Sequence, residues 1–164
     1  MKLTPENVIG VGIDAPLYWV TQGDRAVDQL VRQQIVNLGA PNGTVQAVNS
    51  LCGACLVQGM LAGVLARRQF HGVSITESHP KALLWLLGHA TRQNPPDHIS
   101  LLDLPEFNLA GGFHPADHER DAALACLSAW AMIHQFAGWR DVAADEQQER
   151  FSLIDPPPSY WVPG

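Results

Sequence analysis

The hydrophobic pattern of this chain predicts two short strands, each leading into a carboxylate. Residues 8–13 are an uncharged run of valine, isoleucine and glycine that ends at the Asp-Ala-Pro of residues 14–16. Such a run is typical of a strand buried on both faces. A second β-rich segment, residues 72–78, contains Val-Ser-Ile-Thr followed by Glu77. We therefore expect Asp14 and Glu77 to follow two strands of one sheet.

Apolar residues at helical spacing predict the other regular elements. We expect helices over residues 24–38, from Asn49 or Ser50 to 68, over 80–87 and over 117–136. Asp24 and Asp117 are candidate N-caps, and Gly39 is placed to end the first helix. The alternation of strands and helices predicts an α/β fold.

The remaining segments predict loops and an irregular tail. Prolines and turn residues dominate residues 91–112, and the sequence after Gly138 is polar until a proline-rich end. We expect residues 151–164 to form a C-terminal tail that packs on the surface or on another subunit through Tyr160 and Trp161. At 164 residues, the whole chain 1–164 is the size of a single domain.

Composition narrows the possible partners. Charged residues make up only 16% of the chain, against a norm of roughly 25%. This shortage suggests apolar surface covered by another subunit, and hence a homo-oligomer. The formal net charge of −6 disfavours bulk coating of nucleic acid. No apolar run of about 18 residues exists, so we expect no membrane partner.

Cysteine usage points to a reducing compartment. Three cysteines are an odd number, and the start of the sequence has no secretory apolar run, which favours the cytoplasm. Cys52 and Cys55 have C-x-x-C spacing, which is found in zinc and redox sites. Because no second ligand pair accompanies them, we interpret them as buried thiols of an apolar helix.

Three acidic residues are candidates for a common site. Ligands bind open α/β sheets beyond the carboxyl ends of the strands, where Asp14 and Glu77 are expected. Asp121 lies in the first turns of the last helix, whose small side, including Ala125 and Ser128, permits close approach to a sheet. Converging carboxylates repel one another unless a cation lies between them, which favours Mg²⁺ or Mn²⁺. Each acid taken alone is also explained as a turn former or a helix cap.

Basic residues offer candidate contacts for a phosphorylated substrate. Arg25, Asp28 and Arg32 share one face of the first helix, where they form either a solvated ion-pair strip or a binding surface. Lys81 follows Glu77 closely and is a candidate phosphate contact. We carry Arg25, Arg32 and Lys81 forward as candidate substrate-binding residues.

Four short motifs occur in an order that resembles a known family. They are Val-Gly-Ile-Asp-Ala-Pro-Leu at 11–17, Arg-x-x-Asp-x-x-x-Arg at 25–32, Glu-Ser-His-Pro at 77–80 and His-Glu-Arg-Asp-Ala at 118–122. This order resembles that of the domain-of-unknown-function family classed as predicted RNase H-like nucleases. The resemblance covers residue 8 to about residue 131.

The resemblance implies an RNase H-like mixed sheet flanked by helices. It also implies divalent-metal-dependent phosphodiester hydrolysis, with Asp14, Glu77 and Asp121 as catalytic metal ligands around Mg²⁺ or Mn²⁺. Nucleic acid or another phosphorylated molecule would be the substrate. Family members usually have further strands before the Ile-Asp-Ala-Pro motif, and we expect a sheet without those N-terminal strands.

Two other functions remain open from the sequence. The first is a non-catalytic scaffold or interaction protein that keeps the fold and assembles through its apolar tail. The second is an enzyme that binds a nucleotide or sugar phosphate on the related actin-like fold, although no glycine-rich phosphate loop supports it.

Overall fold

The computed structural model describes residues 7–48, 53–107 and 116–164. The strands are β1 (Gly10–Ile13), β2 (Ser74–Glu77), β3 (Trp139–Asp141) and β4 (Ser159–Pro163). The α-helices are α1 (Ala26–Leu38), α2 (Gly53–Gln69), α3 (Pro80–Leu86) and α4 (Asp117–His134). Short 3₁₀ turns lie at Asn42–Thr44, Pro96–His98, Leu101–Asp103 and Val142–Asp145. The expected α/β class is therefore confirmed.

The four strands form one mixed sheet in the order β1-β2-β4-β3. β1 and β4 both run parallel to β2, whereas β3 is antiparallel to β4. In the β1–β2 register, Gly12 pairs with Thr76 and Ile13 pairs with Glu77. The carboxyl ends of β1 and β2 therefore meet at one edge of the sheet, as the sequence led us to expect.

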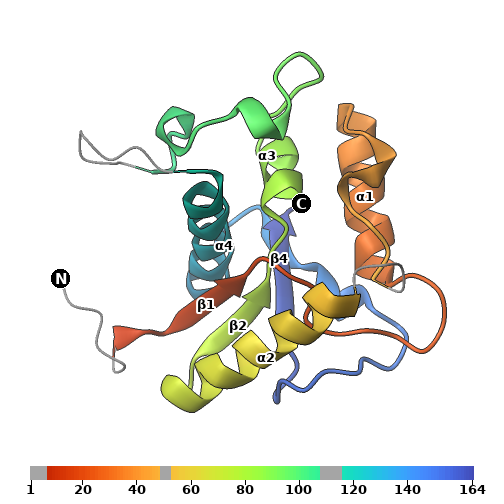
Figure 1. Ribbon diagram of the computed structural model, residues 1–164, viewed down its shortest axis with the longest axis vertical. Helices are drawn as coiled ribbons and strands as arrows, with labels where there is room; N and C mark the ends of the chain where they lie inside the picture. Colours follow the sequence, from red (N-terminus) through yellow and green to blue (C-terminus); the bar gives the residue numbers. More distant parts are fainter. Residues whose placement is uncertain (1–6, 49–52, 108–115) are drawn as a thin grey trace.

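Helices α2 and α4 cover opposite faces of the sheet (Figure 1). On one face, Val11 and Ile13 of β1 pack into an apolar cluster that includes Val64 of α2. On the other face, a Cβ added at Gly12 would lie only 1.8 Å from the Ala125 carbonyl oxygen of α4. Glycine at this position allows the helix backbone to lie directly on the strand.

The small side of α4 has the role that its sequence predicted. Ala125, Ser128 and Ala129 are buried against the sheet, although Ala122 is exposed. Because Gly12 holds Ala125 close to β1, the turn that precedes Ala125 lies near the carboxyl end of that strand.

The C-terminal tail was predicted wrongly. Residues 159–163 form β4, which lies between β2 and β3 inside the sheet. Tyr160 is 1% exposed and Trp161 is 9% exposed, so these side chains fill the protein's own core. The side chain of Thr76 helps to hold this strand, since its hydroxyl accepts a hydrogen bond from the Trp161 N–H at 3.1 Å.

Two predicted N-caps are shifted by one residue. Arg25, not Asp24, is the N-cap of α1, and its side chain makes no capping bond. The helix start is capped from a distant segment, because the Ala26 N–H donates to the Glu146 carboxylate at 2.7 Å. In α4 the cap is residue 116, and Asp117 is the first helical residue.

Other helix boundaries agree with the prediction. Gly39 ends α1 with a φ of 110°, and Pro80 begins α3. The predicted caps Asn49 and Ser50 lie outside the described residues, as does Cys52. Hydrophobic residues from α1, α3, α4 and β4 form the largest core cluster, which places α1 and α3 beside the carboxyl ends of the strands.

Candidate functional site

A pocket of about 330 Å³ lies at the carboxyl ends of β1 and β2. Three of the four sequence motifs contribute to its wall, although they are far apart in the chain. The contributing motif residues are Asp14, Ala15, Pro16, Arg25, Asp28, Glu77, Ser78 and His79. The fold therefore brings three of the four motifs together around one pocket.

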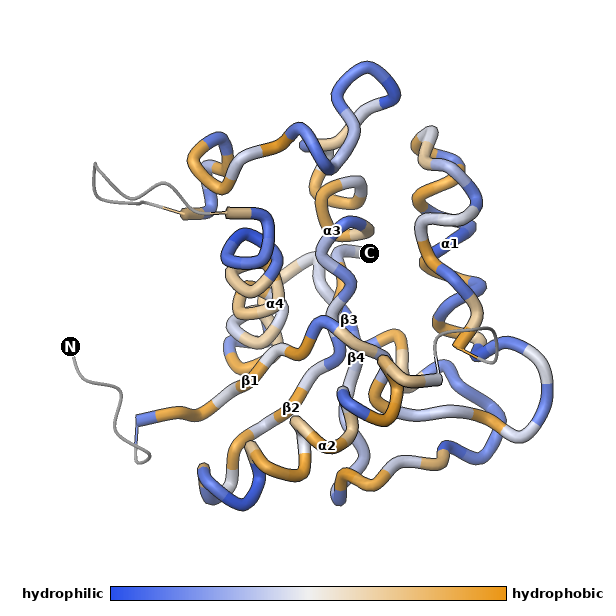
Figure 2. Tube along the Cα trace, viewed as in Figure 1, coloured by the Kyte–Doolittle hydropathy of each residue, from blue (hydrophilic) through white to orange (hydrophobic). Residues whose placement is uncertain are grey.

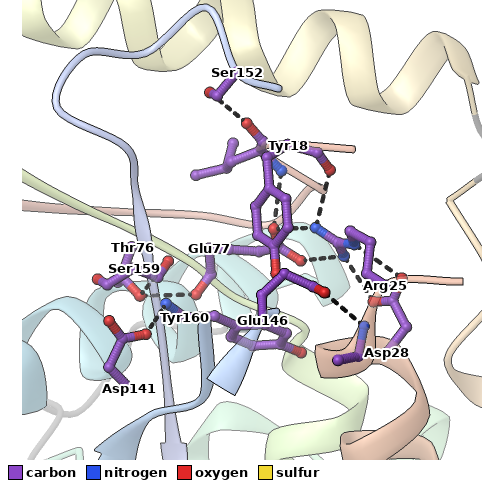
Figure 3. Close-up of polar contacts among 12 residues, drawn as sticks. Tyr18, Arg25, Asp28, Thr76, Glu77, Asp141, Glu146, Ser152, Ser159 and Tyr160 are labelled. Atoms are coloured by element: carbon purple, nitrogen blue, oxygen red, sulfur yellow. Dashed lines mark hydrogen bonds and ion pairs between the residues drawn. The ribbon is translucent and has the colours of Figure 1, made fainter. Parts of the chain in front are cut away.

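Arg25 is held between two carboxylates at the inner wall of the pocket (Figure 3). Its Nη1 and Nη2 donate to the two Glu77 oxygens at 2.8 and 2.7 Å. Its Nε and Nη2 donate to the two Asp28 oxygens at 2.9 and 2.6 Å. The Arg25 Nη1 also donates to the Tyr18 carbonyl at 3.2 Å. These five bonds match the five N–H groups of a guanidinium, so Arg25 has no donor left for a phosphate.

Burial makes this cluster a charged part of the core. Arg25 and Asp28 are each 2% exposed, and Glu77 is 3% exposed. Although burial lowers the pKa of Arg25, the facing carboxylates raise it well above its usual value, so the guanidinium stays charged. The Tyr18 ring lies against the guanidinium, 4.6 Å from its carbon.

Glu77 is occupied by structural contacts. Besides its ion pair with Arg25, it accepts a hydrogen bond from the Leu17 N–H at 2.9 Å. Burial raises the pKa of Glu77, and the charge of Arg25 opposes that shift. Both Glu77 oxygens therefore accept hydrogen bonds from Arg25 or Leu17. The sequence did not predict these bonds.

Strand alternation directs Glu77 and Ser78 to opposite faces of the sheet. Successive side chains of a strand point to opposite faces, and Glu77 pairs with Ile13, which faces α2. The next residue, Ser78, faces α4, where its hydroxyl lies 3.4 Å from that of Ser128. Asp14 follows the end of β1 and lines the same pocket as Glu77. Besides burial, the charges of both Asp121 and Glu77 raise the pKa of Asp14. Glu77 differs from Asp14 in being enclosed by its bonds to Arg25 and Leu17.

Asp14 also lies within range of the charge of Asp121 on α4. Asp121 precedes Ala125 by one helical turn, and Ala125 lies against Gly12, two residues before Asp14. Partial burial, followed by the charge of Asp121, raises the pKa of Asp14 to about 6, while Lys81 acts in the opposite direction and Glu77 adds a smaller upward contribution. Among the described residues, no group donates a hydrogen bond to the Asp14 carboxyl.

Asp121 keeps one oxygen outside its ion pair. Arg120 donates from Nε and Nη2 to the same atom, Asp121 Oδ1, at 3.0 and 2.8 Å. Arg120 is itself fixed by the carbonyl oxygens of Pro96 and Ile99, each at 2.9 Å. Asp121 is thereby oriented by α4 and the 96–99 turn, and Oδ2 is not used in these bonds.

The other two basic candidates are placed differently from each other. Arg32 binds the Val45 carbonyl at 2.8 Å and pairs with Asp24 at 3.1 Å, and it does not line the pocket. Lys81 pairs with Asp97 at 2.6 Å, with side chains that are 44% and 64% exposed. Lys81 is therefore the candidate cation whose charge reaches the Asp14 carboxyl.

No group of three His, Cys, Asp or Glu side chains in the described part of the chain is arranged to hold a metal ion. The proposed metal ligands Asp14, Glu77 and Asp121 thus do not form one three-carboxylate cluster in this structure. A site made of Asp14 and Asp121 alone is a smaller donor set, which a hard cation completes with water or phosphate oxygens.

Several pocket residues were not predicted from the sequence. Tyr160 reaches the pocket from β4, and Thr44 and Val45 reach it from the turn after α1. Cys55 also lines the pocket and is exposed, so its predicted burial was wrong. His79 lies at the same edge, and burial lowers its pKa, which favours the neutral imidazole.

Comparison with protein-family models, curated proteins and solved structures found no match to this chain. Among the described helices, none combines the length and apolar character needed to cross a membrane.

Proposed function

We propose that this chain is a divalent-metal-dependent phosphodiester hydrolase with an RNase H-like fold. The observation that carries the proposal is that Asp121 lies near Asp14. Partial burial and the charge of Asp121 raise the pKa of Asp14 to about 6. A divalent cation between the two carboxylates would relieve their repulsion.

Asp14 and Asp121 would supply part of the ligand set of Mg²⁺ or Mn²⁺. Mg²⁺ is commonly held by one or two protein carboxylates, with its remaining positions filled by water and substrate phosphate. Asp14 supplies a carboxyl without a hydrogen-bond donor among the described residues, and Asp121 supplies Oδ2. When bound, such an ion acidifies a water molecule and neutralises phosphate charge.

Other side chains of this protein would attract the substrate or position the site. Lys81 would attract a phosphate toward Asp14. To do so, it would exchange its exposed ion pair with Asp97 for an ion pair with the phosphate. Arg25 is unable to serve as a phosphate contact, and its role is to hold Glu77 and Asp28. Within this proposal, Glu77 is a positioning residue that ties the Leu17 backbone to the end of β2.

The convergence of the motifs supports the RNase H-like interpretation. The Ile-Asp-Ala-Pro, Arg-x-x-Asp and Glu-Ser-His-Pro segments all line one pocket, and the fourth motif supplies Asp121. Nucleic acid or another phosphorylated molecule is the substrate class that the resemblance and the charge of Lys81 near Asp14 favour together.

We also propose a cytoplasmic homo-oligomer. The odd cysteine count and the free, exposed thiols of Cys55 and Cys126 favour a reducing compartment. The low content of charge and exposed hydrophobic side chains such as Trp130 favour a covered surface.

A scaffold without catalytic activity is the second candidate. It is favoured by one observation, the complete engagement of Glu77 by Arg25 and Leu17, which removes a carboxylate that the sequence assigned to the metal. Absence of metal binding would select this candidate.

The test is hydrolysis of a chromogenic phosphodiester and of single-stranded RNA and DNA with Mg²⁺ or Mn²⁺. We expect turnover that stops on chelation and falls at least about 100-fold in Asp14→Asn and Asp121→Asn. Asp117→Asn is the matched control, since it removes an exposed carboxylate from the same helix and should keep full activity. Turnover that persists in Asp14→Asn, or without metal, would contradict the proposal.

A further inference from the structure

β1 has the composition of a central strand but lies at the edge of the sheet. Its only strand neighbour among the described residues is β2, and all four of its residues are half-buried. Figure 2 shows hydrophobic residues alternating with glycines along β1. Natural edge strands are usually protected by a charge, a proline or a bulge. Residues 10–13 contain none of these.

The backbone of β1 offers hydrogen-bonding groups on its outer side. The carbonyls of Ile9 and Ile13 accept bonds from the Ser74 and Ser78 N–H groups of the β2 side, at 3.0 and 2.8 Å. In a strand, alternate residues direct their N–H and C=O groups to opposite edges. Gly10 and Gly12 therefore direct theirs away from β2, outside the sheet.

The hollow beside this edge is lined mainly by apolar residues. A hollow of about 250 Å³ runs between the start of β1 and α4, with walls that include Ile9, Trp130 and Ile133. Ile9 is 62% exposed and Trp130 is 46% exposed. No Asp, Glu, Lys or Arg lines the hollow. A second chain with the same net charge of −6 would therefore meet no like charge at this surface.

We propose that two copies of this chain join at the outer edge of β1 into one continuous sheet, with the two strands antiparallel. A two-fold axis at Val11 places Gly10 opposite Gly12 of the second copy, and Gly12 opposite Gly10. Each glycine then both donates and accepts across the interface, so that every outward group finds its complement. The α4 helices of both copies lie on the same face of the joined sheet, where Trp130 and the hollow become covered.

This pairing is self-complementary, and that property selects a second copy as the occupant. The two outward residues are spaced symmetrically about Val11, so an identical antiparallel strand meets both of them with matching N–H and C=O groups. The competing occupant of this edge is a strand from a different polypeptide. A molar mass in solution equal to that of one chain would favour that alternative.

The test is the molar mass in solution, measured by light scattering and sedimentation over a dilution series. We expect twice the chain mass of 17.9 kDa for the wild type. Gly10→Pro removes one outward N–H per chain and should raise the dimer Kd at least about tenfold. The first residue of a strand tolerates proline, so β1 should still form in that variant.

Gly10→Ala is the matched control for this substitution. It adds a Cβ at the same place, 3.0 Å from the flexible Ile133 side chain, but it keeps the N–H and should remain dimeric. If Gly10→Pro fails to fold by circular dichroism, Ile9→Lys replaces it, since a charge at the edge should also dissociate the dimer.

Leu61→Lys distinguishes this edge from the exposed apolar side of α2, where Leu61 is 49% exposed. It should leave the dimer intact. A monomeric wild type, a dimer unaffected by both edge substitutions, or a dimer dissociated only by Leu61→Lys would each overturn the proposal.

Discussion

Replacing Arg25 by methionine should destabilise the fold strongly. Arg25→Met nearly conserves the side-chain volume but leaves Asp28 and Glu77 facing each other without a cation, at 2% and 3% exposure. Removing one partner from a buried ion pair typically lowers the free energy of unfolding by about 3–5 kcal/mol. That is a large part of the roughly 5–15 kcal/mol expected for a whole domain.

The destabilisation should depend on pH. Burial and the charge of Asp28 raise the pKa of Glu77, and removing Arg25 removes the charge that opposes this shift. Groups shifted in this direction favour folding at low pH and lose that contribution as the pH rises. The difference between wild type and Arg25→Met should therefore be larger at pH 8 than at pH 5.

Urea unfolding followed by tryptophan fluorescence measures the effect directly. For a chain of this length, a loss of that size corresponds to a decrease in Tm of roughly 6–20 °C. Glu77→Gln should be milder, because Arg25 keeps its pair with Asp28. Arg140→Met is the surface control: it breaks an ion pair with side chains 41% and 53% exposed, and it should lower the free energy of unfolding by less than about 1 kcal/mol. An effect of Arg25→Met no larger than that of Arg140→Met would refute the reasoning.

Two further predictions concern the neighbouring elements. Asp14→Asn should raise the Tm at pH 7.5 in metal-free buffer, because the pKa of Asp14 is about 6 in the folded protein and its ionisation opposes folding above that pH. The gain should disappear near pH 4, and a gain that is independent of pH would show that Asp14 is not the titrating group. Gly12→Ala should lower the free energy of unfolding by at least about 2 kcal/mol, since its Cβ would meet the Ala125 carbonyl oxygen, a backbone atom that is unable to rotate away. Gly43→Ala, at a position with open space, is its control in urea unfolding, and equal effects of the two would contradict the close approach of α4.

Local sequence patterns predicted the elements whose own residues carry the signal. β1 and β2 are short β-rich runs, and α1 ends at Gly39 because only a residue that tolerates positive φ fits there. β4 was missed because its evidence is not local. A five-residue strand after three prolines resembles a tail until β2 and β3 are known to flank it.

The candidate site was predicted in position but not in orientation. The sequence indicated that Asp14 and Glu77 both end strands, and both do lie at the same edge of the sheet. The contacts of Glu77 depend on register, because the pairing of Ile13 with Glu77 directs the Glu77 side chain to the face of the sheet that Ile13 occupies. No pattern within either strand reveals that register. Likewise, the Arg-x-x-Asp spacing indicated a shared helix face but not that Arg25 would reach Glu77.

Calorimetric titration with Mn²⁺ at pH 7.5 tests the central claim most directly. The account predicts that the wild type and Asp117→Asn bind the ion with similar affinity, and that Asp14→Asn and Asp121→Asn bind it at least about tenfold more weakly. Wild-type affinity should also decrease below pH 6, where protons compete for Asp14. Equal binding by the wild type and Asp14→Asn, or no binding by the wild type, would contradict the joint action of Asp14 and Asp121 on a metal ion.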